Sequence, residues 1–329
     1  MNSNITKEIK QLSENYTNLG KVKTITILEP GNINSINYKI ITSKGKYVIR
    51  KTLQDYDPKR LLQMCKILNF LNKNKIKVPH PIKNKKNRYF EISQKIYLTQ
   101  FYEGKFFQGK NKELKDIAKN LAILHKNLEK NKIKYNYDPN SKFFKIITIK
   151  ELKTIQRIIR NKKNVDLFDK KTSKNIDYLI KQVTMDYKKS NFIKKLNIKK
   201  QLIHGDLHPK NVIFSNNKVK VVLDFNSMRN GFKIEDIMFS SFRFGSFYNS
   251  NPKKILNSLE IFLQTYLLYN NLDTMELENS HYFLKHMILS RISFLLKKRY
   301  FSNSNLWKKD FTKHLNSLKI AEKMNISII

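Results

Sequence analysis

The sequence predicts an α+β fold of two lobes: a small antiparallel sheet with one helix at residues 1–101, and a larger, mostly helical lobe at residues 102–329. Near the start of the chain, short runs rich in β-branched residues are separated by turn residues, which is typical of a meander of strands. From residue 112 onward, apolar residues recur mainly at helical spacing. Each lobe is long enough to bury a core of its own.

The small lobe is expected to contain five strands and a helix. The strands are expected at residues 21–28, 36–42, 47–52, 89–93 and 95–101. Asp57 and Pro58 suit the N-cap and first turn of a helix whose apolar positions recur as far as Leu71. Pro79 and Pro81 then forbid further helix.

The larger lobe is expected to be helical on both sides of a short β segment. Apolar stripes predict helices at residues 112–124, 149–159, 174–185, 255–268 and 283–296. The first two of these helices are separated by a polar connector at residues 127–140.

The β segment carries the most informative motif of the chain, IHGDLHPKNVIF at residues 203–214 followed by VVLDFN at residues 221–226. Asp206 and Asn211 are five residues apart on a predicted loop, and Asp224 follows Asn211 by thirteen, at the end of an apolar strand. That interval has room for one hairpin. In a phosphoryl-transfer loop of the form H-x-D-x-x-x-x-N, the Asp accepts the proton of the attacking hydroxyl. The Asn and a later Asp hold magnesium against the nucleotide phosphates.

These motif residues resemble the aminoglycoside phosphotransferase and choline kinase superfamily, which has a protein-kinase-like fold and carries H-G-D-x-x-x-x-N. Residues 121–125 (LAILH) are similar to a helix of that superfamily, residues 101–104 (FYEG) to its hinge, and residues 31–38 to its nucleotide loop. Among the members of this superfamily, the chain most resembles the bacterial homoserine kinases of this fold. The resemblance lies in the N-terminal sequence at residues 31–49 and in the Pro-His-Pro junction at residues 79–81. The resemblance implies a nucleotide-binding N-lobe and a C-lobe that holds the catalytic loop and the acceptor.

Asp206 is the candidate catalytic base, because a carboxylate is already deprotonated at pH 7 and can take a proton as the new bond forms. Asn211 and Asp224 are the candidate ligands of Mg²⁺, which prefers a few hard oxygen ligands. Two roles are open for His208: a hydrogen bond to the γ-phosphate, or a part in shaping the loop. His204 is expected to be structural.

Arg50 or Lys51 is expected to reach the α- and β-phosphates of ATP from the third strand. Strand alternation lets only one of the two point into the nucleotide site, and the family pattern, two hydrophobic residues and then a cation, favours Arg50. The helix glutamate that pairs with this cation in protein kinases is absent, with Gln63 and Met64 near its expected place.

Further nucleotide contacts are expected from the loop and from the hinge. Gly31 is the only glycine of the nucleotide loop, so side chains such as Asn34 and Ser35 are expected to contact the phosphates. Gln100 and Tyr102 are expected to present backbone groups to adenine. Helix residue Asp236 resembles an aspartate that braces the catalytic loop in this superfamily.

The resemblance implies an ATP-dependent, magnesium-dependent enzyme that transfers the γ-phosphoryl group to a hydroxyl of a small metabolite, of which homoserine or a similar amino alcohol fits best. A sugar, N-acetylhexosamine or aminoglycoside kinase and a non-catalytic nucleotide-binding pseudokinase are the alternatives. Arginines that could hold a substrate carboxylate are Arg229, Arg243 and Arg291. Acidic residues that could hold a cationic antibiotic are sparse in the tail, where the main ones are Glu276, Glu278 and Asp310.

Composition adds limits on compartment and partners. The 65 Lys and Arg outnumber the 26 Asp and Glu, for a net charge of +39. The lysines are scattered and accompany many Asn and Ile residues, which favours A/T-rich codon usage over a nucleic-acid interface. A single cysteine, Cys65, excludes an intrachain disulfide and favours a reducing cytoplasm. Neither a secretory signal nor a membrane span is expected, and the oligomeric state is open.

Overall fold

The computed structural model describes residues 16, 19–28, 35–52, 57–91, 96–135, 145–196, 198–302 and 308–324. The chain forms two compact units. Unit 1 comprises Met1–Asn136 and Pro209–Ser227, and unit 2 comprises Tyr137–His208 and Met228–Ile329. The lobe boundary at residue 101 is a different division of the chain, and it stays a prediction.

Unit 1 is built on an antiparallel sheet with the order β1-β2-β3-β6-β4, in which β5 also pairs with β6. The strands are β1 (Val22–Leu28), β2 (Ser35–Thr42), β3 (Lys46–Thr52), β4 (Pro81–Ile82), β5 (Phe90–Glu91) and β6 (Ile96–Gln100). The predicted strands are thus present, and only the very short β4 was not expected, because proline is confined to edge positions in sheets.

Strand register fixes which face of the sheet Arg50 occupies. Ile49 on β3 lies between Tyr38 and Leu98 of the neighbouring strands, and all three side chains are buried in one apolar cluster. Since successive side chains alternate between faces, Arg50 belongs to the face opposite this cluster, whereas Lys51 shares the face of Ile49.

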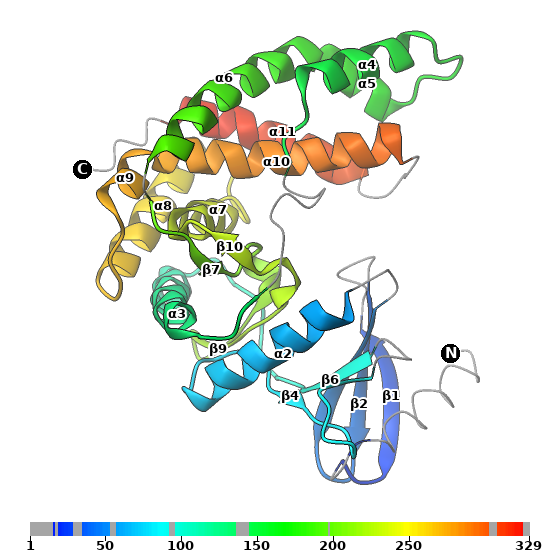
Figure 1. Cartoon of the computed structure of the whole chain (residues 1–329), viewed down its shortest axis with the longest axis vertical. Helices are drawn as coiled ribbons and strands as arrows, with labels where there is room; N and C mark the ends of the chain where they lie inside the picture. The colour runs from blue at the N-terminus through cyan, green and yellow to red at the C-terminus, as the bar shows by residue number, and fades with distance from the viewer. Residues whose placement is uncertain are drawn as a thin grey trace. The chain divides into compact units, whose positions relative to one another are not determined.

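Helix α2 (Pro58–Lys73) begins as predicted, with the Asp57 carboxylate accepting a hydrogen bond from the Lys59 amide at 2.9 Å. Its buried face includes Cys65, whose thiol pKa is raised by burial to about 12. This helix packs on β4 and β5, beside the sheet in Figure 1. The buried thiol therefore acts as a small apolar group.

Unit 1 also contains α3 (Asn111–Lys130) and the hairpin of β8 (Val212–Ser215) and β9 (Lys218–Val222). The hairpin turns at Asn216 and Asn217, both with positive φ, as a two-residue hairpin turn requires. The Val219 amide donates to the Asp116 carboxylate of α3 at 2.7 Å, which ties the hairpin to that helix.

Unit 2 is mostly helical, with one short strand pair, β7 (Gln201–Ile203) and β10 (Arg229–Gly231). Its helices are α4 (Ile149–Arg160), α5 (Leu167–Lys174), α6 (Ile176–Lys195), α7 (Lys233–Gly245), α8 (Pro252–Leu267), α9 (Thr274–Glu278), α10 (Ser280–Phe301) and α11 (Lys308–Lys323). Helix α10 contacts α6, α7, α9 and α11, and Figure 1 shows α11 running along it. Apolar residues all round α10 make it the centre of this unit's core.

Three sequence expectations need correction. The connector expected from residue 127 begins later, because α3 continues to Lys130. Residue 174 ends α5 and does not begin a helix. The following helix, α6, continues to Lys195, well past the predicted end at residue 185. The α+β prediction itself is confirmed.

Candidate active site

The catalytic-loop motif begins in unit 2, where the loop after β7 is held by a buried carboxylate. The backbone amides of His204 and Gly205 donate to the two oxygens of Asp236, at 2.6 and 2.7 Å. Asp236 lies in the first turn of α7 and is 1% exposed. Gly205 has a φ of +78°, which a residue without Cβ adopts at no steric cost. The expected bracing role of Asp236 is therefore present in the structure.

His204 is fully buried, and its Nδ1 accepts a hydrogen bond from the Asp206 amide at 3.2 Å. The imidazole thus shapes the backbone on both sides of Gly205, in keeping with the structural role expected for it.

Asp206 follows this turn with a side chain that is 28% exposed. Arg291 of α10 donates to its Oδ1 at 2.9 Å and to the Gly205 carbonyl at 3.1 Å. Burial raises the pKa of Asp206. The positive charges of Arg291, then His208 and Arg243, lower this pKa by more than burial raises it, so it lies below its ordinary value. The carboxyl is thus ionised at neutral pH. The His208 imidazole lies beside it, with Nε2 at 4.0 Å from Oδ2.

The predicted metal ligands lie in unit 1, at one end of the β8–β9 hairpin. The pairing of Val212 with Val222, and a 2.7 Å hydrogen bond from the Leu223 amide to the Asn211 carbonyl, bring Asn211 next to the residues just before Asp224. The hairpin predicted between the two residues is therefore present.

Asp224 has a φ of +61° and takes part in an ion pair with Arg50 of β3, whose Nη1 is 3.3 Å from Oδ1. Arg50 also donates from Nε to the Ser35 hydroxyl at 3.1 Å, and Asn226 donates to the same Asp224 oxygen at 2.5 Å. Of the two adjacent cations, Arg50 is thus the one that lies beside Asp224.

The hinge residues are placed by backbone hydrogen bonds within unit 1. The amides of Gln100 and Phe101 donate to the carbonyls of His80 and Lys46. The Tyr102 hydroxyl accepts from the His80 amide at 3.0 Å, so this side chain ties down the Pro-His-Pro junction. Asn34 and Gly31 of the expected nucleotide loop lie outside the described residues.

Two arginines take positions that the sequence did not reveal. Arg60 of α2 donates to the backbone carbonyl of Asn226 and, at 3.1 Å, to the Tyr135 hydroxyl. The sequence offered one signal for Arg60. It lies one helical turn before Gln63, on the same face of the helix, and Gln63 is near the expected place of the helix glutamate. Arg229, one of the three candidates for an acceptor carboxylate, is instead 5% exposed and paired with Glu235.

Comparison with known proteins decides the family. The sequence pattern of the phosphotransferase enzyme family matches residues 24–255, which is more than half of the chain and includes the whole motif. The chain belongs to the phosphotransferase enzyme family. No curated protein sequence matches it.

Solved structures of similar fold are themselves phosphotransferases. A spectinomycin phosphotransferase solved with ADP and spectinomycin is 17% identical, with a TM-score of 0.69 and 97% of each chain covered. An amicoumacin kinase is 14% identical, with a TM-score of 0.66 over 98% of this chain and 97% of that one. A choline kinase from Streptococcus pneumoniae is 14% identical, with a TM-score of 0.64 over 98% and 100%. The prediction of a kinase-like α+β fold is confirmed, and the family match confirms the prediction of a phosphotransferase.

The donor set of this phosphotransferase fits a magnesium ion. Asn211 and Asp224 offer hard carboxamide and carboxylate oxygens at one end of a hairpin, and Mg²⁺ takes few protein ligands beside phosphate and water. Oδ1 of Asp224 is engaged by Arg50 and Asn226, whereas Oδ2 accepts no hydrogen bond from the described residues. One carboxylate oxygen is thus available to a cation.

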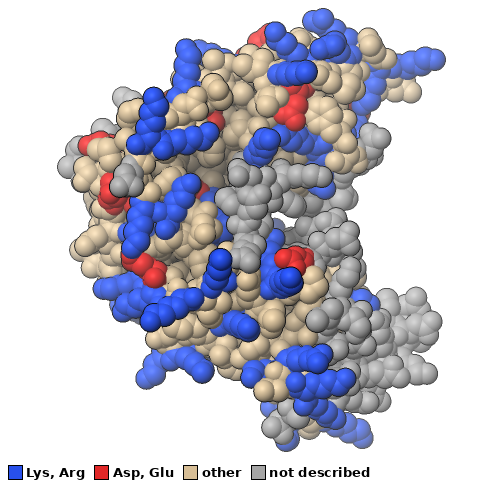
Figure 2. Space-filling model, in the orientation of Figure 1, with Lys and Arg blue, Asp and Glu red and all other residues tan. Residues whose placement is uncertain are grey.

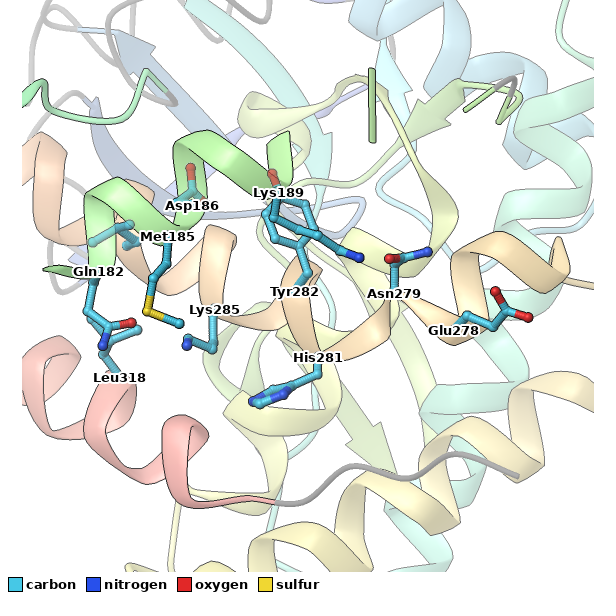
Figure 3. Close-up of a pocket in the computed structure, with 11 residues that line it drawn as sticks. Gln182, Met185, Asp186, Lys189, Glu278, Asn279, His281, Tyr282, Lys285 and Leu318 are labelled. Atoms are coloured by element: carbon cyan, nitrogen blue, oxygen red, sulfur yellow. The ribbon is translucent and has the colours of Figure 1, made fainter. Parts of the chain in front are cut away.

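A cavity of about 350 Å³ in unit 2 is lined by residues of α6, α9, α10 and α11. Figure 3 shows lining side chains from α6, such as Met185 and Lys189, and from α10, such as His281 and Tyr282. Of the residues that the sequence singled out, Glu278 is among its described lining residues, whereas none of the catalytic, nucleotide or metal candidates is. Within the described ranges, none of the helices has the length and hydropathy that crossing a bilayer would need.

Proposed function

We propose that this phosphotransferase moves the γ-phosphoryl group of ATP to the hydroxyl of homoserine or a similar amino alcohol, with Asp206 as the base. The observation that carries the proposal is the Asp206 carboxylate itself, which stands on a loop braced by Asp236 at the head of the family motif. The low pKa of Asp206 keeps it ionised, so it can accept the hydroxyl proton late, as the oxygen–phosphorus bond forms.

The nucleotide side of the reaction is assigned to unit 1. Asn211 and Asp224 would hold Mg²⁺, which when bound neutralises charge on the phosphates. Arg50 would turn from Asp224 to the α- and β-phosphates, with Ser35 beside it and Lys51 on the other face of the strand. Asn34 is assigned to the phosphates from the sequence alone. Its present pairing with Asp224 takes the place of the missing helix glutamate.

Adenine recognition is assigned to the hinge. Because the amide of Gln100 is already bonded to His80, Tyr102 is the one of the two predicted hinge residues whose amide is left for the base. No described residue accepts a hydrogen bond from that amide.

His208 is proposed to donate a hydrogen bond to the transferred phosphoryl group, since its ring lies beside the Asp206 carboxylate. A part in shaping the loop is the alternative. The two roles differ in kinetics: a phosphate contact affects kcat, and a loop-shaping role also affects stability.

The acceptor is the least constrained part. The similar structures include kinases of spectinomycin, amicoumacin and choline, so the fold serves acceptors of unlike size. Homoserine is favoured by the opening at residues 31–49 and by the absence of the helix glutamate. A sugar, N-acetylhexosamine or aminoglycoside acceptor is the second candidate, and the cytoplasm is the proposed compartment.

An acceptor panel with coupled detection of ADP tests the proposal. Homoserine, N-acetylhexosamines, choline and an aminoglycoside are each offered with ATP and Mg²⁺. Homoserine or a close amino alcohol is expected to give the highest kcat/KM, and Asp224→Asn is expected to raise the Mg²⁺ concentration needed for half-maximal rate. Nucleotide binding with no turnover on any acceptor would instead support a non-catalytic pseudokinase.

A further inference from the structure

Two arginines of unit 2 lie close to the proposed base and share one aromatic ring. The guanidinium carbon of Arg243 on α7 is 5.5 Å from the centroid of Phe239, and that of Arg291 on α10 is 5.3 Å from the same centroid. Asp206 is paired with Arg291 at 2.9 Å and is close enough to Arg243 for the two to affect each other's pKa. The cluster therefore has two cations and one carboxylate at its centre.

The charges of this cluster are partly buried, with Asp206 and Asp310 near the two arginines. The pKa of Arg243 is lowered by burial. The negative charges of Asp206 and Asp310 raise this pKa, and repulsion from Arg291 lowers it. The nearby His314 is 9% exposed, and burial followed by both arginines holds its pKa well below the ordinary value, so it stays neutral. Arg243 is only partly buried, and its nitrogen atoms donate to no described residue, so they are available to a bound anion.

Other interior arginines of unit 2 are each paired with a carboxylate. Arg229 is paired with Glu235, and Arg299 with Asp166 at 2.9 Å. Arg243, by contrast, makes no hydrogen bond or ion pair with any residue that the structure describes. Its five donors are arranged as a planar fork that matches a carboxylate.

We propose that Arg243 and Arg291 bind an acidic group of the acceptor, a carboxylate, beside Asp206, so that the enzyme selects short hydroxy acids over neutral or cationic alcohols. This inference rests on the proposed function, because it assigns the acceptor to the neighbourhood of the base. It also narrows the acceptor class, since two guanidinium groups next to the base repel a polycationic antibiotic. Arg291 and His314 lie beyond residue 255, outside the segment that matches the family pattern, whereas Arg243 lies within it.

The first experiment compares each acid with its carboxamide. Homoserine, serine, threonine and 4-hydroxybutanoate are assayed beside their amides with ATP and Mg²⁺. The wild-type enzyme is expected to favour the acid by about 10- to 100-fold in kcat/KM, the usual worth of hydrogen bonds to a charged group. In Arg243→Gln the preference should shrink toward one, and Arg243→Lys, which keeps the charge and loses the fork, should fall between.

Lys298→Gln is the matched control, because it removes a charge from α10 at a residue that lies over Phe294 and is not among the charges that act on Arg243. It should leave the acid preference unchanged. Equal rates on acids and amides in the wild-type enzyme would overturn the anion site while the proposed phosphotransfer stands.

A binding measurement keeps the inference testable without turnover. Calorimetric titration of 2-aminobutanoate, which has no hydroxyl, and of its amide is done with Mg²⁺ and a non-hydrolysable ATP analogue present. Saturable binding of the acid that Arg243→Gln weakens by about tenfold or more supports the anion site even if no acceptor turns over. In that case it is the proposed function that fails. Equal binding of acid and amide, or an unchanged affinity in Arg243→Gln that melts like the wild type, overturns the anion site.

Discussion

At Asp206 two opposing physical effects act on one carboxyl group. Burial alone favours the neutral acid, which could not accept a proton from the acceptor. Arg291, at 2.9 Å, favours the carboxylate more strongly, and the pKa lies below its ordinary value. Arg291 thus keeps the Asp206 carboxyl ionised, and it also lowers the proton affinity of that carboxylate.

The pH dependence of turnover tests this effect of Arg291. In Arg291→Met the burial effect on Asp206 is no longer offset by this cation, so the pKa of the carboxyl rises. Because the base must be ionised, the acidic limb of the kcat profile should move to higher pH. The profile is measured at saturating acceptor and ATP, and an unmoved acidic limb would separate Arg291 from the ionisation of Asp206.

His314 predicts an acid-sensitive contribution to stability. Its folded pKa lies well below 6.5, so below pH 6.5 the unfolded chain binds a proton that the buried imidazole does not. The free energy of unfolding should therefore fall as pH drops through this range, by up to about 1.4 kcal/mol per pH unit for one proton. His314→Gln should reduce that slope in urea unfolding series.

His281, whose pKa is also lowered by burial, leaves part of the slope in place. Identical slopes in the wild type and in His314→Gln would show that His314 is not the group responsible.

Individual residues were predictable where the chain itself fixes their spacing. Asp206, Asn211 and Asp224 follow from one continuous motif, and strand alternation reduced Arg50 and Lys51 to a choice of one. Arg291 comes 85 residues after Asp206, and only folding brings it there. The sequence could offer Arg291 as a candidate anion binder but gave no reason to place it beside Asp206.

At the scale of elements, helix α7 holds the loop that follows strand β7. Asp236, in the first turn of α7, accepts two charge-assisted hydrogen bonds from the loop amides. Neither bond depends on a substrate, so the loop conformation is set before the acceptor binds.

Asp236→Asn tests this arrangement. The amide side chain can accept one of the two hydrogen bonds and must present a donor to the other buried amide. The free energy of unfolding should drop by about 2–3 kcal/mol, and kcat should fall with little change in nucleotide affinity. Asp177→Asn, at an exposed position of α6, should change stability by no more than about 0.5 kcal/mol. Equal effects of the two changes would mean that Asp236 does not hold the loop.

Elements with strong periodicity and clear end signals were predicted well, and short ones were not. Asp57 and Pro58 marked the start of α2, and the stripes of α3, α8 and α10 gave their existence. Strand β4 consists of two residues beginning at Pro81, and its pairing with β6 is a long-range contact that no local pattern shows. Helix α5 depends on a capping box between Asp166 and Asp169 in a segment with few apolar residues.

For the molecule as a whole, the net charge of +39 is the property with the widest reach. Figure 2 shows Lys and Arg side chains spread over the displayed face, with Asp and Glu among them. A distribution of this kind attracts small anions such as ATP from solution.

Ionic strength tests this long-range attraction. Raising KCl from about 20 to about 300 mM shortens the screening length to less than half, so kcat/KM for ATP should fall by roughly threefold or more while kcat changes little. The measurement uses a fixed excess of Mg²⁺ over ATP. A kcat/KM that does not respond to salt would assign the charge to composition alone.

The kinase-like fold was predictable at this scale because the family motif and the order of elements agree along most of the chain. The acceptor was less predictable, because the groups that would select it, such as Arg243 and Arg291, come from separate helices and need the fold to meet. Homoserine therefore stays a proposal, whereas the phosphotransferase family is shown.

The most direct test of the central claim is single-turnover phosphoryl transfer by Asp206→Asn with saturating ATP, Mg²⁺ and acceptor. Asparagine keeps the size of the side chain and removes its ability to take the hydroxyl proton. We predict a rate about 10²- to 10⁴-fold below that of the wild type, with ATP affinity changed by less than about twofold. Transfer at the wild-type rate would contradict the account.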